Sequence, residues 1–382
     1  MGRQPDRITD PEEVIDPAQR AEAIRDFIIE QATAQKRLDR RYVNRRAAVA
    51  AGRDMMFMEE LDSTLKSVFR SGWTAPQRYK GKKARYTERL ANVIISDTHF
   101  QSLIDPRECP VEYTAIQESR RLAKVAVQVA DYKRQYRHET KLRVKLLGDL
   151  IQNQLHDQRE GAPLTIQVAA TLHYLLKAVL FWASEFPEVE VFCVPGNHGR
   201  NKARHHDRGV QQKWDSIETM IYVSLKAALE AARVTNVKVH ISMRPYIVED
   251  LFDKKAFWTH GDTVLKPGYP GKSINVAMLY HQICRWNAAR NINGPFHLFG
   301  VGHVHFGSLT HMPGGIVMLT NSCLVPPDPF AVSIGAPDVT CGQYLFESVR
   351  GHACGDQRFI DVDDADDNKA LDGVITPFSG EL

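Results

Sequence analysis

Five short groups of residues able to bind a metal are spread along the sequence. In chain order they are Asp97-Thr98-His99, Gly148-Asp149, Gly196-Asn197-His198, His260-Gly261-Asp262 and Gly302-His303-Val304-His305. A carboxylate and an imidazole two residues apart occur often by chance. Five such groups in one chain, each after a strand-like apolar run, predict one site assembled from distant parts of the chain.

The donor types indicate which metals this site would take. With Asp262 left aside, the groups contain two carboxylates, one amide and five histidines. Mixed oxygen and nitrogen donors suit Mn²⁺, Fe²⁺ or Zn²⁺ better than Ca²⁺ or Mg²⁺ alone. There are more donors than one ion can use. We therefore expect two divalent ions about 3.5–4 Å apart that share one carboxylate, with Mn²⁺ first and Fe²⁺ or Zn²⁺ as alternatives.

The hydrophobic pattern predicts the elements that position these groups. We expect strands at residues 92–96, 143–147, 189–194, 237–241, 256–259, 296–301, 315–320 and 343–347, and helices at about 112–136, 164–185, 214–232 and 273–290. Strand–helix alternation followed by a strand-rich half predicts a two-sheet α/β sandwich. Ligands of open α/β sheets bind at the carboxyl ends of the strands, where the first three groups fall.

Composition and charge indicate a globular chain with an N-terminal appendage. Of 382 residues, 43% are hydrophobic and 25% charged, which is enough for a large core. Residues 1–90 carry 19 Lys and Arg against 14 Asp and Glu, whereas the remainder carries 30 against 32. We expect a basic helical extension and linker at 1–88, a core at 89–350 and an acidic C-terminal tail at 351–382.

The cysteines and the N-terminus bear on the compartment. Six scattered cysteines with no Cys-x-x-Cys pair favour a reducing environment. The N-terminus has no apolar signal region, and the apolar stretch at 174–182 is interrupted by Lys177 and is short for a membrane span. We expect a soluble cytoplasmic protein with no membrane partner.

The ordered groups resemble the motifs of the calcineurin-like metallophosphoesterase superfamily, over residues 91–320. The resemblance implies an α/β/β/α metallophosphoesterase sandwich, here with an N-terminal helical extension. It also implies which residues bind each ion: Asp97, His99 and His305 for the first, Asn197, His260 and His303 for the second, and Asp149 as the bridge. Two such ions would activate a water for attack on phosphorus and neutralise phosphate charge.

The same resemblance implies roles beside the metals. His198 would not bind metal but would protonate the leaving oxygen or stabilise the transition state, and Asp262 would orient a ligand imidazole. Arg200 opens a basic stretch at 199–208 and could grip a substrate phosphate, although a solvated loop is the alternative. Gly-Asn-His-Gly-Arg followed by basic residues is similar to phage-type, DNA-repair exonuclease-like members. His156 could contact substrate or be an ordinary loop histidine.

The substrate is a separate question, since one fold can host several phosphoesterases. The extension is rich in arginine, and its linker places Lys80, Lys82 and Lys83 near Tyr79 and Tyr86, which favours DNA as partner. A solvated helix face, or a surface for homo-oligomers, would explain the same residues. We expect a nuclease acting on DNA phosphodiesters. The alternatives are a phosphodiesterase or phosphatase for a small nucleotide or phosphoprotein, and a binding protein with a relic site.

Overall fold

The computed structural model describes residues 89–379, apart from 106, 108, 110, 112, 137–140, 154–160, 202–212, 269–273, 291 and 337. The predicted extension at 1–88 lies outside the described residues. The same holds for His156 and for most of the basic stretch that follows Arg200.

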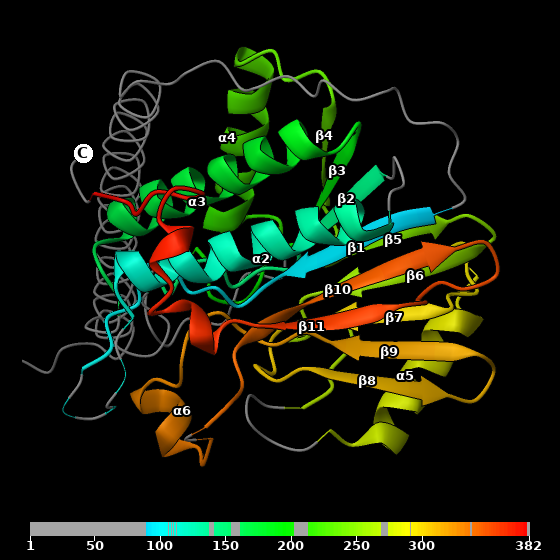
Figure 1. The fold of residues 1–382 in the computed structure, drawn as a ribbon. Coiled ribbons are helices and arrows are strands. Elements are labelled where there is room, and N and C mark those ends of the chain that lie inside the picture. The colour runs from blue at the N-terminus through cyan, green and yellow to red at the C-terminus, as the bar shows by residue number, and fades with distance from the viewer. Residues whose placement is uncertain are drawn as a thin grey trace, which may run out of the picture. The chain divides into compact units, whose positions relative to one another are not determined.

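Parallel strands form one side of the first sheet, whose order is β11-β10-β1-β2-β3-β4. The parallel strands are β1 (Arg89–Ile95), β2 (Lys141–Leu146), β3 (Val189–Cys193) and β4 (Val237–Ile241). Two antiparallel strands complete it, β10 (Gly342–Val349) and β11 (Gln357–Asp361). Figure 1 shows the helices of this half on one face: α2 (Ala115–Tyr136), α3 (Leu164–Glu185) and α4 (Ile217–Ala231).

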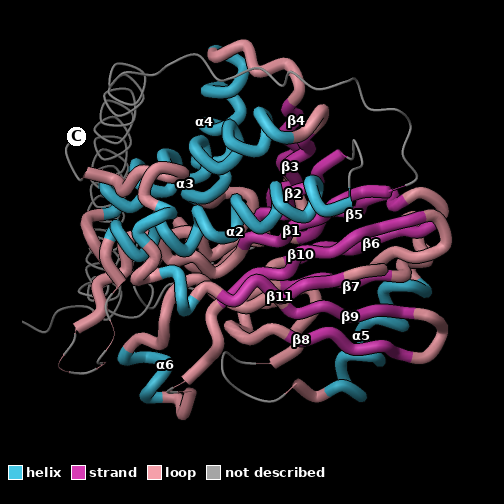
Figure 2. Tube along the Cα trace, in the orientation of Figure 1, coloured by secondary structure: helices cyan, strands magenta, loops and turns pink. Residues whose placement is uncertain are grey.

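The second sheet has the order β5-β6-β7-β9-β8. Its strands are β5 (Tyr246–Leu251), β6 (Lys254–Thr259), β7 (Leu298–Val301), β8 (Ser308–Met312) and β9 (Ile316–Thr320). Strands β6, β7 and β9 are parallel to one another. The remaining elements are α5 (Val276–Ala288), α6 (Pro329–Ser333) and the short 3₁₀ turns η1 (Asp363–Ala365) and η2 (Lys369–Leu371). Figure 2 shows the strands of both sheets between the helices.

Strand β6 shows how the layers pack, because successive strand residues face opposite sides of a sheet. Trp258 belongs to the core between the sheets, together with Ile94 of β1 and Phe346 of β10. Its neighbour Phe257 belongs to a second core, under α5, with Ile283. Burial of each such side chain contributes about 1.5–3 kcal/mol. The predicted two-sheet α/β sandwich is thus confirmed.

A buried ion pair also joins the two sheets. Lys145 of β2 is fully buried, and its Nζ lies 3.2 Å from Glu249 Oε1 of β5 and 2.5 Å from Asn92 Oδ1. The indole N–H of Trp258 donates to Glu249 Oε2 at 2.7 Å. Burial lowers the pKa of Lys145 to about 8, although Glu249 opposes this. Because the metal-binding groups come from both sheets, this contact helps to hold the two halves of the site in register.

The C-terminal segment is folded onto the core and does not hang free as a tail. Strand β11 pairs with β10 at the edge of the first sheet. Arg121 of α2 donates from Nε and Nη2 to the two carboxylate oxygens of Asp366, at 2.8 and 2.7 Å. Arg120 donates to Asp372 at 2.6 Å. Asp366 and Asp372 of the acidic C-terminal segment therefore pair with basic residues on α2.

Helix α3 is long and apolar enough, by length and composition, to cross a membrane, but 61% of its most apolar window is buried inside the fold. Its 22 residues match the predicted helix, whereas the apolar stretch considered from the sequence alone was shorter. Tyr174 and Trp182 are among its buried residues, which is the pattern of a core helix.

Candidate metal centre

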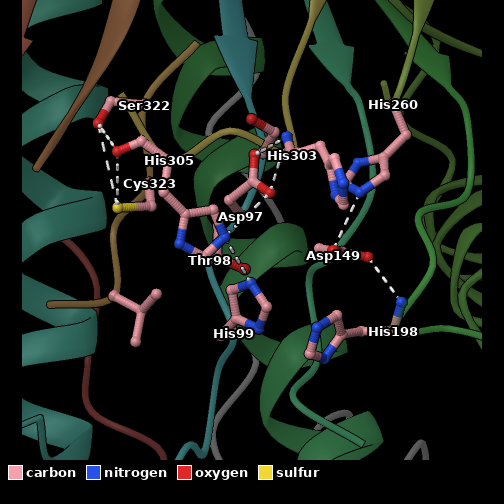
Figure 3. A network of polar contacts seen from close by, with 12 residues as sticks. Asp97, Thr98, His99, Asp149, His198, His260, His303, His305, Ser322 and Cys323 are labelled. Carbon is pink, nitrogen blue, oxygen red and sulfur yellow. Dashed lines mark hydrogen bonds and ion pairs between the residues drawn. The ribbon is translucent and has the colours of Figure 1, made fainter. Parts of the chain in front are cut away.

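The five predicted groups meet at the carboxyl ends of parallel strands from both sheets. Asp97 follows β1, Asp149 follows β2, and Asn197 and His198 follow β3. The second sheet supplies His260 after β6, and His303 and His305 after β7. The main-chain N–H of His303 donates to both carboxylate oxygens of Asp97 at 3.0 Å, which joins the two sheets at the site. Figure 3 shows the two carboxylates and the histidines gathered together, namely Asp97, His99, Asp149, His198, His260, His303 and His305.

Two glycines allow the loops to approach this closely. A Cβ on Gly196 would lie 2.0 Å from Asp149 Oδ1, and one on Gly302 would lie 2.5 Å from Asp97 Oδ2. Real Cβ atoms do not come so close to an oxygen, so any other residue would push the carboxylates away. The glycines of the Gly-Asn-His and Gly-His-x-His groups are therefore required by close contact with the acidic residues.

Backbone strain is concentrated at the expected ligands. Five of the seven have positive φ: Asp97 (53°), His99 (44°), Asp149 (51°), His303 (71°) and His305 (58°). Non-glycine residues in this region cost of order 1–3 kcal/mol each and tend to cluster at functional sites. The surrounding loops impose these conformations to aim the side chains, which supports a functional role for the cluster.

The first donor group consists of Asp97, His99 and His305, whose ligand atoms lie within 4.8 Å of one another. The Nε2 atoms of His99 and His305 are 3.3 Å apart, and His305 Nε2 is 3.5 Å from Asp97 Oδ1. Atoms bound to one ion at about 2.1 Å lie about 3.0–3.4 Å from each other. These separations fit one common ion.

The second donor group consists of Asp149, His260 and His303. His260 Nε2 lies 3.0 Å from Asp149 Oδ2 and 3.0 Å from Asn197 Oδ1. The other ring nitrogen of His260 faces the carbonyl oxygen of Leu147 at 2.7 Å, which can only accept, so Nδ1 carries the proton. In a neutral ring, Nε2 then points a lone pair at Asp149 Oδ2 and Asn197 Oδ1, which are also acceptors. A cation between Nε2 and these two oxygens would satisfy all three atoms.

The histidine pKa values agree with that requirement. Burial alone would lower the pKa of His260, but the Asp149 carboxylate raises it to about 9. Burial lowers the pKa of His303 to about 4, with the charge of His260 adding to the effect. Burial also lowers the pKa of His99 well below its usual value. His99 and His303 are therefore neutral, the form that binds metal, while His260 faces a place that favours positive charge.

His198 lies beside both donor groups. Its main-chain N–H donates to Asp149 Oδ1 at 2.8 Å, and its Nδ1 lies 2.6 Å from the carbonyl oxygen of Gln152, to which it donates. Its ring meets that of His99 edge-on, with 4.5 Å between centroids. His198 also falls in a group with His99 and Asp149 that could hold a metal, so geometry alone allows a ligand or a proton-transfer role.

The structure places Arg200 and Asp262 together, a contact that the sequence did not predict. Arg200 Nη2 donates to Asp262 Oδ2 at 3.0 Å, and Lys213 Nζ donates to the other carboxylate oxygen. Asp262 was expected to orient a ligand imidazole; it instead pairs with two cations. Burial would raise the pKa of Asp262, but Lys213 and His260 lower it to about 2, so the carboxylate is charged.

Two supporting residues were missed from the sequence. Gln152 places its side-chain oxygen 2.6 Å from His99 Nδ1, while its main-chain oxygen accepts from His198. Glu218, in the first turn of α4, accepts from the N–H groups of Leu150 and Gly196, each at 2.6 Å, and so ties together two loops of the site. The signals were slight: Gln152 lies three residues after Asp149, and Glu218 follows the helix-capping Ser216.

The side of the site that holds Asp97 and His305 is covered by the segment between β9 and β10. Leu324 N–H donates to the main-chain oxygen of Asp97 at 3.0 Å, and Ser322 Oγ donates to that of His305 at 3.0 Å. A cavity of about 20 Å³ remains between the two histidines and this segment, lined by His99, His305, Val325, Pro326, Pro327, Asp328, Ala331, Ala336 and Val339. That is room for about one water.

No family model and no curated protein sequence matches the chain. Among solved structures, Vps29 of Chaetomium thermophilum is 10% identical over 67% of this chain and 83% of its own, with a TM-score of 0.27. A dimetal phosphatase of Danio rerio is 12% identical over 72% and 99%, with a TM-score of 0.30. A phosphatase of Mycoplasma pneumoniae is 12% identical over 75% and 99%, with a TM-score of 0.29. Scores this low do not decide activity, which has to be judged from the residues of the site.

Proposed function

We propose that the chain is a dinuclear metal-dependent phosphoesterase of the calcineurin-like kind, and that it is a nuclease acting on DNA phosphodiesters. One observation carries the proposal: the donors form two adjacent groups, Asp97, His99 and His305 in one and Asp149, His260 and His303 in the other. Asp149 lies in the second group and also beside His99 and His198, where a bridging carboxylate would be needed.

The donors fit two divalent ions in number, type and spacing. The first ion would be held by Asp97, His99 and His305, the second by Asn197, His260 and His303, with Asp149 shared. Carboxylate oxygens mixed with imidazole nitrogens suit Mn²⁺, Fe²⁺ or Zn²⁺ better than Ca²⁺ or Mg²⁺, and we propose Mn²⁺ first, with Fe²⁺ or Zn²⁺ as alternatives. When bound, the ions would lower the pKa of a water and neutralise charge on the phosphate.

The protein's own residues would provide positioning and proton transfer. The bond from His198 Nδ1 to Gln152 leaves Nε2 as the ring atom able to exchange a proton with the leaving oxygen. Gln152 also orients His99, so one residue aligns a metal ligand and the proposed acid. The strained backbone at the ligands means that the donor atoms are positioned before substrate arrives.

DNA is proposed as substrate because basic residues lie both beside the site and in the extension. Arg200 and Lys213 stand next to Asp262, two residues after His260. Residues 40–46 contain four arginines, and the linker contains Lys80, Lys82 and Lys83. Basic residues on phosphates would give affinity that falls steeply with salt.

A substrate panel tests the proposal. The purified full-length protein would be incubated with Mn²⁺ and, separately, with single-stranded DNA, duplex DNA, a simple aryl phosphodiester, an aryl phosphomonoester and cyclic nucleotides. We expect cleavage of DNA and of the simple diester, and no cleavage after the metal is chelated. If small esters are hydrolysed while DNA is left uncleaved, the protein is a phosphatase or nucleotide phosphodiesterase and not a nuclease. No turnover with Mn²⁺, Fe²⁺ or Zn²⁺ would reject a phosphoesterase.

The extension can be tested within the intact chain. Replacement of Lys80, Lys82, Lys83 and Arg85 by alanine should weaken DNA binding and reduce its salt dependence, because fewer phosphate contacts release fewer counterions. Turnover of the simple diester should be unaffected. DNA affinity equal to that of the wild type at several salt concentrations would remove the linker from the binding surface.

A further inference from the structure

Arg200, Asp262 and Lys213 form a largely buried ion cluster beside the metal centre. Only 5% of the Asp262 side chain and 9% of the Lys213 side chain are exposed, while Arg200 is 31% exposed. Each cation bonds a different oxygen of the one carboxylate. These three residues are not needed to bind the metal ions, since none of them belongs to the donor groups.

The cluster carries more positive than negative charge. Two cations share one carboxylate, so their formal charges leave an excess of one positive charge, and of the two cations only Arg200 has substantial access to solvent. Charges removed from water are costly unless they are fully paired. A second anion would complete the pairing, and a phosphate is well suited because it can accept from guanidinium and ammonium groups together.

The backbone around Arg200 is fixed, so the guanidinium is held close to the reacting centre. The main-chain N–H of Arg200 donates to the main-chain oxygen of Asn197, an expected ligand, at 3.4 Å. Its own main-chain oxygen accepts from Asn153 Nδ2 at 3.2 Å, and Asn153 also bonds the main-chain oxygen of His198 at 2.6 Å. The same short turn thus carries an expected ligand, the proposed acid and one cation of the cluster.

The opposite side of the centre gives a substrate little room. There the segment with Val325, Pro326 and Ala336 leaves a cavity of only about 20 Å³ against His99 and His305. Prolines offer no N–H to a phosphate, and among the residues that the structure describes no lysine or arginine lines that cavity. A chain of phosphodiesters held at the metals would therefore continue over the charged side.

We propose that Arg200 and Lys213 form a subsite for a second phosphate of the substrate, adjacent to the phosphate that is hydrolysed. Asp262 keeps the two cations in place and competes with the incoming phosphate for them. The inference rests on the proposed phosphoesterase function and narrows its substrate class. The preferred substrate is a phosphodiester with a neighbouring phosphate, as in an oligonucleotide, and not an isolated ester.

A matched pair of chromogenic esters tests the subsite. Thymidine 5′-(4-nitrophenyl phosphate) would be compared with the same compound carrying a 3′-phosphate, so that the reacting bond and leaving group are identical. We expect kcat/KM to be about tenfold higher with the 3′-phosphate at low salt, since one charge-assisted hydrogen bond is worth about that factor. Lys213→Ala should bring the ratio close to one, and Lys213→Arg should retain most of it. Lys238→Ala, a change at a lysine side chain that is 61% exposed, is the control and should keep the full ratio.

A binding measurement separates failure of the subsite from failure of the proposed function. Calorimetry on the protein without added metal would compare thymidine 3′,5′-bisphosphate with thymidine 5′-monophosphate. We expect a preference of about tenfold for the bisphosphate, lost in Lys213→Ala and increased in Asp262→Asn, which removes the competing charge. Equal kcat/KM for the two esters in the wild type, or a ratio that survives Lys213→Ala, would overturn the subsite while leaving the phosphoesterase in place. If neither ester is hydrolysed but the bisphosphate preference holds, the proposed function fails and the anion site stands.

Discussion

The two sides of the metal centre are built differently. On the side of Asp97 and His305, a proline-rich segment bonded to the main chain of these residues leaves space for about one water. On the side of His260, a buried cluster of two cations and one carboxylate adjoins the ligands. One side is closed by prolines and small apolar residues around a single carboxylate, Asp328, and the other holds two cations.

This difference separates two tasks that the proposed phosphoesterase would have to perform. Donor atoms must be fixed before substrate arrives, and backbone of positive φ does this in both donor groups. On the closed side, the segment between β9 and β10 adds hydrogen bonds to the main chain of Asp97 and His305. The substrate must also be recognised, and the charged side offers the groups for that. Changes on the closed side should therefore affect metal binding, and changes on the charged side should affect substrate preference.

The largest effect is expected from His198, which lies between the two sides. His198→Ala should lower kcat by about 10²–10⁴-fold, the range for loss of a general acid, while both ions remain bound. Steady-state kinetics and metal analysis of the same preparation would check this. Loss of an ion in the variant would make His198 a ligand, a role that its position beside His99 and Asp149 also permits.

Gln152 should affect the closed side alone. Gln152→Leu removes the acceptor that orients His99. The affinity for one of the two ions should fall by about 10–100-fold, because loss of such a partner misaligns the imidazole. Gln152→Glu keeps an acceptor and should retain the affinity. Metal titration gives the two affinities, and ¹⁵N spectra of the imidazoles report the His99 tautomer. An equal loss of affinity for both ions would show that the two sides of the metal centre do not act separately.

Glu118 offers a pH test of the scaffold behind the closed side. Its carboxylate accepts from the side chain of Gln101, two residues after His99, at 2.8 Å. Burial raises its pKa from 4.5 to about 7, so the folded protein holds this proton more tightly than the unfolded chain. The free energy of unfolding should therefore fall by about 3 kcal/mol as the pH rises from 4.5 to 7.5. Chemical denaturation of the wild type and of Glu118→Gln at several pH values would isolate this change in the free energy of unfolding, which the variant should lack.

Regular elements were predictable where the hydrophobic pattern was long. Helix α3 (Leu164–Glu185) and strand β4 (Val237–Ile241) have the expected bounds. Strands β5, β8 and β11 and helix α6 were missed. Strand β11 is mostly polar and lies at a sheet edge, and α6 has only five residues, so neither carries a clear period.

The donor residues were predictable because each follows a strand, but their support was not. Gln152 contacts His99 at a separation of 53 residues in the sequence, and Glu218 contacts Leu150 at a separation of 68 residues. Such contacts depend on how the loops fold over one another. The pairing of Arg200 with Asp262 was missed for the same reason, since a spacing of 62 residues gives no local signal.

The central claim is that two ions share this site. Titration of the full-length protein with Mn²⁺, followed by metal analysis and electron paramagnetic resonance, measures this directly. The account predicts two ions per chain with spectra of a magnetically coupled pair, and loss of the coupling in Asp149→Ala. A single uncoupled ion at saturation, or a coupled pair that persists without Asp149, would contradict it.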